Sequence, residues 1–255
     1  MNKTNIDYAH YTWNPCTGCR HACPYCYAAR INKRFGDGKF TPTFHRERLG
    51  EPLTVKKPSK IFVGSMADLF GDWNWAVGTW EFSPAEVMAD IFETVDQCPQ
   101  HTFIFLTKNP RGMQGIKFPD NCWCGTSVEN QEKANQRIPD LLEVNCKTLF
   151  VSYEPALGEI DLSELPGYWH PGCTTHDALL GRLVHHDDDM RWTSDRKIDW
   201  LVIGAQTGPG AVPPNPEWIT GAIDQCRGAG VPIFVKDNVK MHTAIREYPG
   251  REQER

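Results

Sequence analysis

The sequence lacks any long hydrophobic run. Its apolar stretches are short, as at residues 61–63 and 200–203, whereas a membrane-spanning helix needs about 20 consecutive apolar residues. Residues 1–7 also lack the apolar core of a secretory signal. These absences predict a soluble cytoplasmic protein that binds no membrane and keeps its cysteines reduced.

The chain also lacks an excess of positive charge. It carries 27 Lys and Arg residues against 32 Asp and Glu residues, a formal net charge of -5, which argues against a protein that coats nucleic acid through bulk electrostatics. Basic residues nevertheless crowd into one early segment, whereas acidic residues cluster at 187–189. This basic segment fits a polyanion-binding groove and an ordinary solvated face equally well. Its members are Arg30, Lys33, Arg34, Lys39, Arg46, Arg48, Lys56, Lys57 and Lys60.

Strand and helix signals alternate regularly along the chain, which is typical of parallel β/α units. Six or seven such units predict one α/β domain over residues 1–255, a partial (open) parallel β/α TIM-like barrel, with a doubly wound sheet as the alternative. Residues 158–197 break the alternation and are predicted to be an inserted loop region. The strands are expected at 60–64, 102–107, 122–126, 148–152, 200–204 and 232–236, with one more directly before Cys16.

Local signals also predict where helices begin and end. The Ser-Pro-Ala-Glu run at 83–86 combines an N-cap, a proline at the first helical position and a capping box. A second helix is expected to start after Asn215 and to stop at Gly228 and Gly230, and a third to span 131–144. Each of these helices is expected to bury one apolar face against the sheet.

Four of the ten cysteines, Cys16, Cys19, Cys23 and Cys26, are clustered within residues 16–26. Structural disulfides are rare in a reducing compartment, so a metal centre is the simpler explanation. Structural zinc prefers two cysteine pairs separated by a longer loop than the one here. An iron–sulfur cluster accepts closely spaced thiolates on one irregular loop, and the spacing therefore favours it over zinc.

The same loop carries a resemblance to a known superfamily. The run from Cys19 to Cys26, with gaps of three and two residues and Tyr25 directly before the last cysteine, resembles the motif of the radical S-adenosylmethionine (SAM) superfamily. Most of the chain resembles one group within it, a phage-associated three-Cys-motif family of largely unassigned function. The segments that carry this resemblance are WNPC at 13–16, GSMADLF at 64–70, LTK at 106–108, GTSVE at 125–129, VSYEP at 151–155, IGAQTG at 203–208 and FVK at 234–236.

The resemblance implies two cofactors and a protein partner. Cys19, Cys23 and Cys26 would hold a [4Fe–4S] cluster whose open iron binds SAM. An external reductant such as flavodoxin or ferredoxin would supply the electron that cleaves SAM, and the resulting 5′-deoxyadenosyl radical would abstract a hydrogen from the substrate. Cys16 is surplus to this set. A buried thiol is the favoured interpretation of Cys16, with a fourth ligand before SAM binds or part of a zinc site as alternatives.

The ends of the predicted strands supply the remaining candidates, because parallel β/α scaffolds build their sites there. The resemblance implies that several strand ends bind SAM, although Ser65 to Asp68 stand where other members carry a Gly-Gly-Glu run. A cap of the next helix or a structural ion pair is the competing interpretation of each candidate. The expected SAM-binding residues are Ser65, Asp68, Ser127, Glu129, Gly204 and Gln206. The expected catalytic residues, on the substrate side, are Lys108, Glu154 and Lys236.

The substrate is less constrained than the chemistry. We expect a radical SAM enzyme, of isomerase, lyase or transferase class, that modifies a nucleic-acid base by rearranging a substituent or that repairs a base. A phage origin would place it in the host cytoplasm, where DNA hypermodification is one such reaction. The basic segment and three tryptophans that could stack a base, Trp73, Trp75 and Trp80, motivate this hypothesis. One alternative is radical SAM chemistry on a peptide or small metabolite, and another is a zinc-stabilised, non-catalytic binding module.

Overall fold

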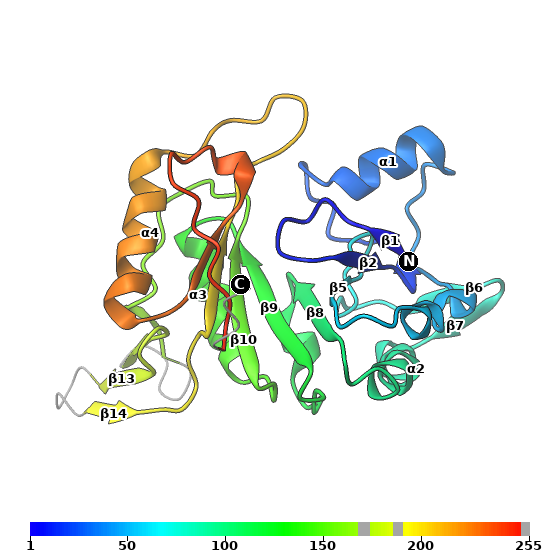
Figure 1. The fold of residues 1–255 in the computed structure, drawn as a ribbon, viewed down its shortest axis with the longest axis horizontal. Helices are drawn as coiled ribbons and strands as arrows, with labels where there is room; N and C mark the ends of the chain where they lie inside the picture. Colours follow the sequence, from blue (N-terminus) through cyan, green and yellow to red (C-terminus); the bar gives the residue numbers. More distant parts are fainter. Residues whose placement is uncertain (168–173, 186–190, 251–255) are drawn as a thin grey trace.

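The computed structural model describes residues 1–167, 174–185 and 191–250. Its centre is an eight-stranded sheet in the order β1-β2-β5-β8-β9-β10-β15-β16 (Figure 1). β1 pairs antiparallel with β2, and every other neighbouring pair is parallel. The strands are β1 (Asn2–Lys3), β2 (Tyr11–Trp13), β5 (Lys60–Val63), β8 (Thr102–Thr107), β9 (Cys122–Val128), β10 (Thr148–Tyr153), β15 (Trp200–Ile203) and β16 (Ile233–Val235).

The parallel strands follow one another in chain order from β2 to β16. A doubly wound sheet would reverse this order once, and the described strands show no such reversal. The sheet does not close, because β1 and β16 lie at its two edges. The structure therefore confirms a mixed α/β fold with a mostly parallel sheet, including the strand predicted directly before Cys16. The edge strand β1 was not predicted.

Two of the four described α-helices begin at the predicted capping signals, a third begins at residue 131 as predicted but ends at Leu142, and the helix over Tyr27–Phe35 was not predicted. The Ser83 Oγ accepts a hydrogen bond from the Glu86 backbone N–H at 3.3 Å, and the Glu86 carboxylate accepts one from the Ser83 backbone N–H at 2.8 Å. Asn215 caps the last helix as predicted, but Gly228 lies inside that helix. Only Gly230, with a φ of 71°, adopts the left-handed conformation that ends it. The helices are α1 (Tyr27–Phe35), α2 (Pro84–Asp96), α3 (Gln131–Leu142) and α4 (Pro216–Ala229), with short 3-10 helices η1 (Arg46–Arg48), η2 (Glu51–Thr54), η3 (Pro110–Met113) and η4 (Asp237–Val239).

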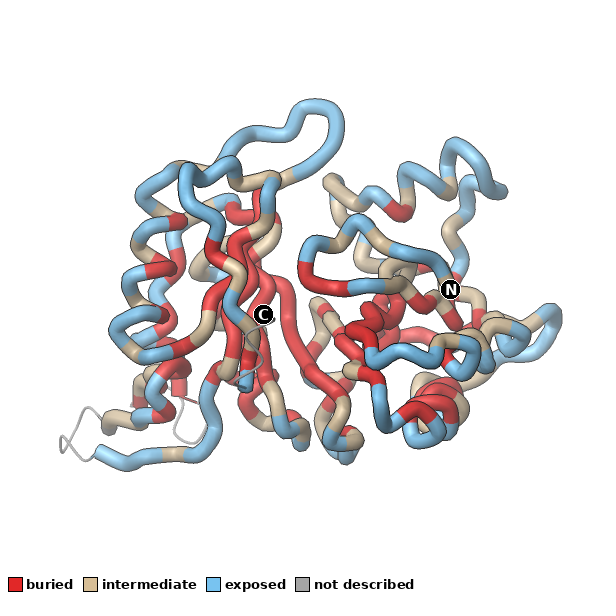
Figure 2. The backbone as a smooth tube through the Cα atoms, in the orientation of Figure 1, coloured by how far each residue is buried: buried red, intermediate tan, exposed pale blue. Residues whose placement is uncertain are grey.

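Both faces of the central sheet are buried, as Figure 2 shows, which explains why its strands have continuous apolar runs. Apolar residues of α2, α3 and α4 pack on one face. Large side chains fill the other face around Trp200, whose ring centroid lies 5.4 Å from that of Tyr8 and 5.5 Å from that of Phe150. This second group, called the inner aromatic cluster below, consists of Tyr8, Ala9, Phe62, Ile104, Trp123, Phe150, Trp200, Val202 and Phe234.

Two small sheets lie outside the central one. Part of the region 158–197, predicted as an inserted loop, forms an antiparallel sheet. Strands of two to four residues carry too little periodicity to be predicted, so neither small sheet was predicted from the sequence. The small sheets consist of β11 (Leu165–Pro166), β12 (Thr174–Asp177), β13 (Arg182–His185) and β14 (Arg191–Thr193), and of β3 (Cys16–Thr17), β4 (Thr43–Phe44), β6 (Trp75–Val77) and β7 (Trp80–Phe82).

No helix in the described part of the chain is long and apolar enough to cross a membrane.

Candidate functional site

A cavity of about 300 Å³ lies at the carboxyl ends of the parallel strands. Three cysteines of the loop that precedes α1, namely Cys19, Cys23 and Cys26, contribute to its wall. The inner aromatic cluster contributes Tyr8 and Phe62. The predicted thiol ligands and the strand ends therefore meet at one cavity.

Strand periodicity explains which polar side chains reach this cavity. Side chains two or four residues apart on a strand share a face. In β10, Phe150 belongs to the inner aromatic cluster, so Ser152 and then Glu154 follow on the same face. The same step leads from inner-face residues of β8, β9 and β16 to Lys108, Ser127 and Lys236. All five of these polar residues line the cavity.

Backbone groups fix the cysteine loop. The Cys19 Sγ accepts a hydrogen bond from the His21 N–H at 3.5 Å, and the Cys26 Sγ caps α1 by accepting one from the Ala29 N–H at 3.4 Å. Gly18 starts the loop with a φ of 91°, and a Cβ there would lie 2.1 Å from a backbone oxygen of residue 41. The turn into the loop thus requires glycine.

Burial sets the protonation of two of the cavity cysteines. It raises the pKa of Cys19 to about 11, against the opposing hydrogen bond from His21, and the nearby charges of Asp68, Cys23 and Cys26 raise it further. Burial also raises the pKa of Cys23, which the Lys108 ammonium opposes. A metal centre must displace these protons to bind, because the thiolate is the ligand.

The three cavity thiols fit an iron–sulfur centre by their chemistry, since soft, partly buried thiolates are its usual ligands. Among the described residues, no three His, Cys, Asp or Glu side chains are grouped so as to hold a single metal ion. A tetrahedral zinc site would bring its sulfurs within about 3.8 Å of each other, given Zn–S bonds of about 2.3 Å. Cys16 does not line the cavity. It is fully buried in the core, and burial raises its pKa, as expected of a core thiol.

Asp68 lines the cavity, but its oxygens are engaged within the protein. It forms a hydrogen bond of 2.8 Å with the His21 Nε2 and accepts others from the Thr107 hydroxyl at 2.7 Å and from the backbone N–H groups of Lys108 at 2.8 Å and Phe70 at 3.1 Å. Burial raises its pKa, yet the His21 interaction and the other hydrogen bonds hold it below its usual range. A carboxylate offers about four acceptor positions, so Asp68 positions the cysteine loop rather than a ligand.

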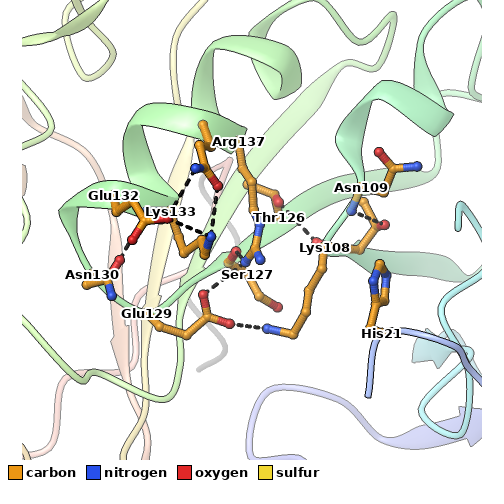
Figure 3. Close-up of polar contacts among 12 residues, drawn as sticks. His21, Lys108, Asn109, Thr126, Ser127, Glu129, Asn130, Glu132, Lys133 and Arg137 are labelled. Atoms are coloured by element: carbon orange, nitrogen blue, oxygen red, sulfur yellow. Dashed lines mark hydrogen bonds and ion pairs between the residues drawn. The ribbon is translucent and has the colours of Figure 1, made fainter. Parts of the chain in front are cut away.

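Glu129 does not line the cavity. It lies between Lys108 and Arg137, as Figure 3 shows, with its Oε2 2.9 Å from the Arg137 Nη1 and its Oε1 paired with the Lys108 Nζ. The Tyr25 hydroxyl donates to the same Oε1. Burial raises the pKa of Glu129, but Lys108, Tyr25 and Arg137 together hold it below its usual value. The expected SAM contact is therefore the centre of an ion-pair network.

The expected catalytic residues all line the cavity but form two separate pairs. The Lys236 Nζ lies 2.6 Å from the Glu154 Oε1, whereas Lys108 pairs with Glu129. Gly204 does not line the cavity, and a Cβ added to it would lie 2.5 Å from the Glu154 Cδ. Its lack of a side chain leaves room for Glu154.

The other expected SAM-binding residues line the cavity as well. Ser127 does so from β9, Ser65 from the loop after β5 and Gln206 from the loop after β15. The Ser65 hydroxyl donates to the Asn14 Oδ1 at 3.1 Å, and the Gln206 Oε1 accepts a hydrogen bond from the Val212 N–H at 3.4 Å. Ser65 and Gln206 are thus anchored at the rim.

Two further cavity residues, Ser152 and Tyr8, were assigned no role from the sequence. The Ser152 side chain is 1% exposed, and its Oγ has no hydrogen-bond partner among the described residues. Its place at a predicted strand end was the available signal. Tyr8 comes from the loop between β1 and β2, and burial raises its pKa. Nothing in the sequence indicated that this loop enters the inner aromatic cluster.

Three of the residues suggested for nucleic-acid contacts are buried. Trp75 is fully buried and Trp73 is 9% exposed, and their rings pack 6.3 Å apart, so neither can stack a base. Trp80 is exposed but does not line the cavity. Lys60 is buried, with its Nζ 4.1 Å from the centre of the Tyr248 ring, so it cannot contact a polyanion.

Comparison with known proteins gives the chain a family. Residues 3–253 match the family model described as a protein of unknown function, DUF5131. Because this match covers nearly the whole chain, the protein belongs to that family. Searches of curated proteins and of solved structures found no match.

Proposed function

We propose that this chain is a radical SAM enzyme, in which Cys19, Cys23 and Cys26 hold a [4Fe–4S] cluster and SAM binds in the neighbouring cavity. The observation that carries the proposal is the position of these three thiols on the wall of a cavity at the strand ends. The open sheet with its parallel strands in chain order supports the proposal, because a partial TIM-like barrel would have this strand order.

A [4Fe–4S] cluster held by Cys19, Cys23 and Cys26 would supply the one-electron reduction of SAM, with the electron coming from an external reductant, and so the radical chemistry that removes a hydrogen atom from a substrate. The chain's own residues prepare the site. Ser127 and Ser152 face each other across the β9–β10 pairing and present two hydroxyls to a ligand. The unpartnered Ser152 Oγ favours a ligand there, because a buried hydroxyl without a partner is costly.

The remaining groups exclude water and face the substrate. The inner aromatic cluster closes the floor of the cavity with apolar rings, which keeps solvent from a reactive species. Glu154 and Lys236 form an ion pair on the wall and can hold a polar group of the substrate. Lys108 stays paired with Glu129, so it holds the cavity wall in place and does not contact the substrate.

The cavity is small for a site that must hold both SAM and a substrate. Its volume of about 300 Å³ lies at the lower end of the range for small-molecule sites, roughly 300–1,000 Å³. SAM alone would occupy most of it, so the substrate must present its reacting group at the mouth. A base of a nucleic acid, modified by rearrangement of a substituent as in DNA hypermodification or else repaired, fits this requirement.

Anaerobic reconstitution tests the proposal. The full chain is loaded with iron and sulfide and supplied with dithionite and SAM, and 5′-deoxyadenosine is measured with and without oligonucleotide, peptide or nucleoside. We expect iron binding and SAM cleavage by the wild type and loss of both in Cys23→Ala. Cys16→Ala is the matched control, because Cys16 lies outside the cavity and its variant should keep its iron. A wild-type protein that binds zinc and no iron, or SAM cleavage by Cys23→Ala, would contradict the proposal.

A further inference from the structure

Helix α1 exposes its large side chains and buries its small ones. Tyr27, Ile31 and Phe35 are four residues apart and share one face, and they are 45%, 43% and 75% exposed. Ala28, which is buried, lies on the face adjoining this stripe, and the half-buried Ala29 lies on the opposite face. A surface helix normally directs its large apolar residues into the core. The stripe of Tyr27, Ile31 and Phe35 is therefore available to a partner.

Basic residues occupy the rest of the exposed surface of α1, with Arg30 and Arg34 next to Tyr27 and Lys33 on the far side of the helix. Arg30, Lys33 and Arg34 are all exposed on α1. Between residues 20 and 39 the chain has five Lys or Arg residues against a single Asp, whereas the whole chain has a net charge of -5. Local charge of this sign attracts a polyanion. We call Tyr27, Arg30, Ile31, Lys33, Arg34 and Phe35 the α1 surface.

Three other members of the early basic segment are engaged or buried. The Arg46 guanidinium lies 3.2 Å from the Asp90 carboxylate, and the Arg48 Nη1 donates to the Asn14 carbonyl at 3.3 Å. Lys60 is buried. Lys39, Lys56 and Lys57 are exposed outside α1, and α1 is the part of the segment where exposed cations and exposed aromatic side chains occur together.

The α1 surface borders the mouth of the cavity. Tyr27 and Ala28 line the cavity from α1, and residues 205–207 line it from the loop that connects β15 to α4. The Arg30 Nη2 donates to the Thr207 carbonyl at 3.4 Å, which joins the two sides. In Figure 1, α1 and this loop both lie above the central sheet, at the same end of its strands. A polymer that lies on the α1 surface can therefore reach the cavity.

We propose that the α1 surface binds a single strand of nucleic acid and delivers one nucleotide to the cavity. This inference rests on the proposed function only for the fate of the delivered base. Cations beside exposed rings are the combination that binds single strands, because the cations track the phosphates and the rings stack with unpaired bases. A duplex hides its bases and would leave Tyr27 and Phe35 without a partner.

Binding of labelled oligonucleotides by the full chain, measured by fluorescence anisotropy without iron or SAM, tests this inference. DNA and RNA strands of about 20 nucleotides, each with its matching duplex, exceed the usual footprint of such a surface. With three cations on the phosphates, the logarithm of the affinity should fall with the logarithm of salt concentration with a slope of about -2. Each single strand should bind more tightly than its own duplex. The tighter binding of the DNA or of the RNA strand then shows which nucleic acid the surface prefers.

Two variants separate charge from stacking. Lys33→Ala/Arg34→Ala should weaken binding and reduce the salt slope by about 1.4, which corresponds to two phosphate contacts. Phe35→Ala should weaken binding by about fivefold or more with an unchanged slope. Lys56→Ala/Lys57→Ala is the matched control, because it removes the same charge from exposed residues outside α1 and should leave binding unchanged.

Several outcomes would overturn the inference. These are equal binding of duplex and single strand, wild-type affinity in both α1 variants, or an equal loss in the Lys56→Ala/Lys57→Ala control. Displacement of the strand by an acidic peptide at equal concentration, or a dimer that Phe35→Ala dissociates, would assign the surface to a protein partner instead. A chain that binds single strands but does not cleave SAM would refute the proposed function alone, so the two failures are distinguishable.

Discussion

Glu129→Gln tests whether the ion-pair network beside the cavity stabilises the fold. Glu129 is 6% exposed and pairs with both Lys108 and Arg137, whose side chains are 17% and 16% exposed. Glutamine keeps the shape of the side chain but removes the charge that both cations face. Breaking a buried ion pair by removing one partner costs about 3–5 kcal/mol. For a chain of this length we expect the melting temperature to fall by roughly 6–20 °C.

The pH dependence of this loss gives a second test. Burial raises the pKa of Glu129, but Lys108 and the other partners hold it below its usual value of 4.5 in the folded protein. The carboxylate therefore contributes stability above the pKa of the unfolded chain, and this contribution is lost as the pH falls through the folded-state pKa. The difference in unfolding free energy between wild type and Glu129→Gln should have its maximum value above about pH 5 and should decrease at lower pH.

Urea unfolding followed by circular dichroism between about pH 3.5 and 8 measures both effects. Glu132→Gln is the matched control, because Glu132 lies on the exposed side of α3, where it contacts Lys133 and Gln136. Fully exposed contacts of this kind contribute little to stability, so this control should hardly change it. A loss below about 1 kcal/mol for Glu129→Gln at pH 7, or a loss that stays constant with pH, would refute the reasoning.

Two further substitutions test the cavity wall. Ser152→Ala removes a buried hydroxyl with no partner among the described residues, so the unfolding free energy should stay constant or rise by about 1 kcal/mol while SAM binding weakens. A clear loss of stability in urea unfolding would show that the hydroxyl is bonded within the protein. Gly204→Ala would place a Cβ 2.5 Å from the Glu154 Cδ, so Glu154 should leave Lys236 at a cost of about 1–3 kcal/mol, with a lower rate of substrate turnover. Gly221→Ala in α4 is the control: its Cβ meets no atom within 4 Å, so it should raise stability by up to about 1 kcal/mol. Unchanged turnover in Gly204→Ala would remove Glu154 from the mechanism.

The sequence predicted those parts of the fold that depend on local signals. Apolar runs predicted the parallel strands, and the Ser83 capping box predicted the start of α2. The same signals predicted the cavity wall, because polar residues at parallel strand ends meet at one edge of the sheet. Lys108, Glu154 and Lys236 were found there by this rule.

The pairing of these residues could not be predicted in the same way. His21 reaches Asp68 across 47 residues of sequence, and Tyr25 reaches Glu129 across 104. Such contacts depend on how the loop crosses the sheet edge, which no periodicity reveals. The tryptophans show the same limit: Trp75 and Trp80 lie on paired strands of one small sheet, yet one is fully buried and the other is 74% exposed.

Polar side-chain contacts add to the backbone hydrogen bonds that fix the cysteine loop over the cavity. No residue from 19 to 26 is fully buried, and two tethers, His21 to Asp68 and Tyr25 to Glu129, join the loop to the strand ends. Lys108 serves both, since its backbone N–H donates to Asp68 and its ammonium pairs with Glu129. A loop held in this way keeps its thiols at the sheet edge without core side chains that would fill the cavity. This is what a site needs if a cluster and a cofactor are to bind beside it.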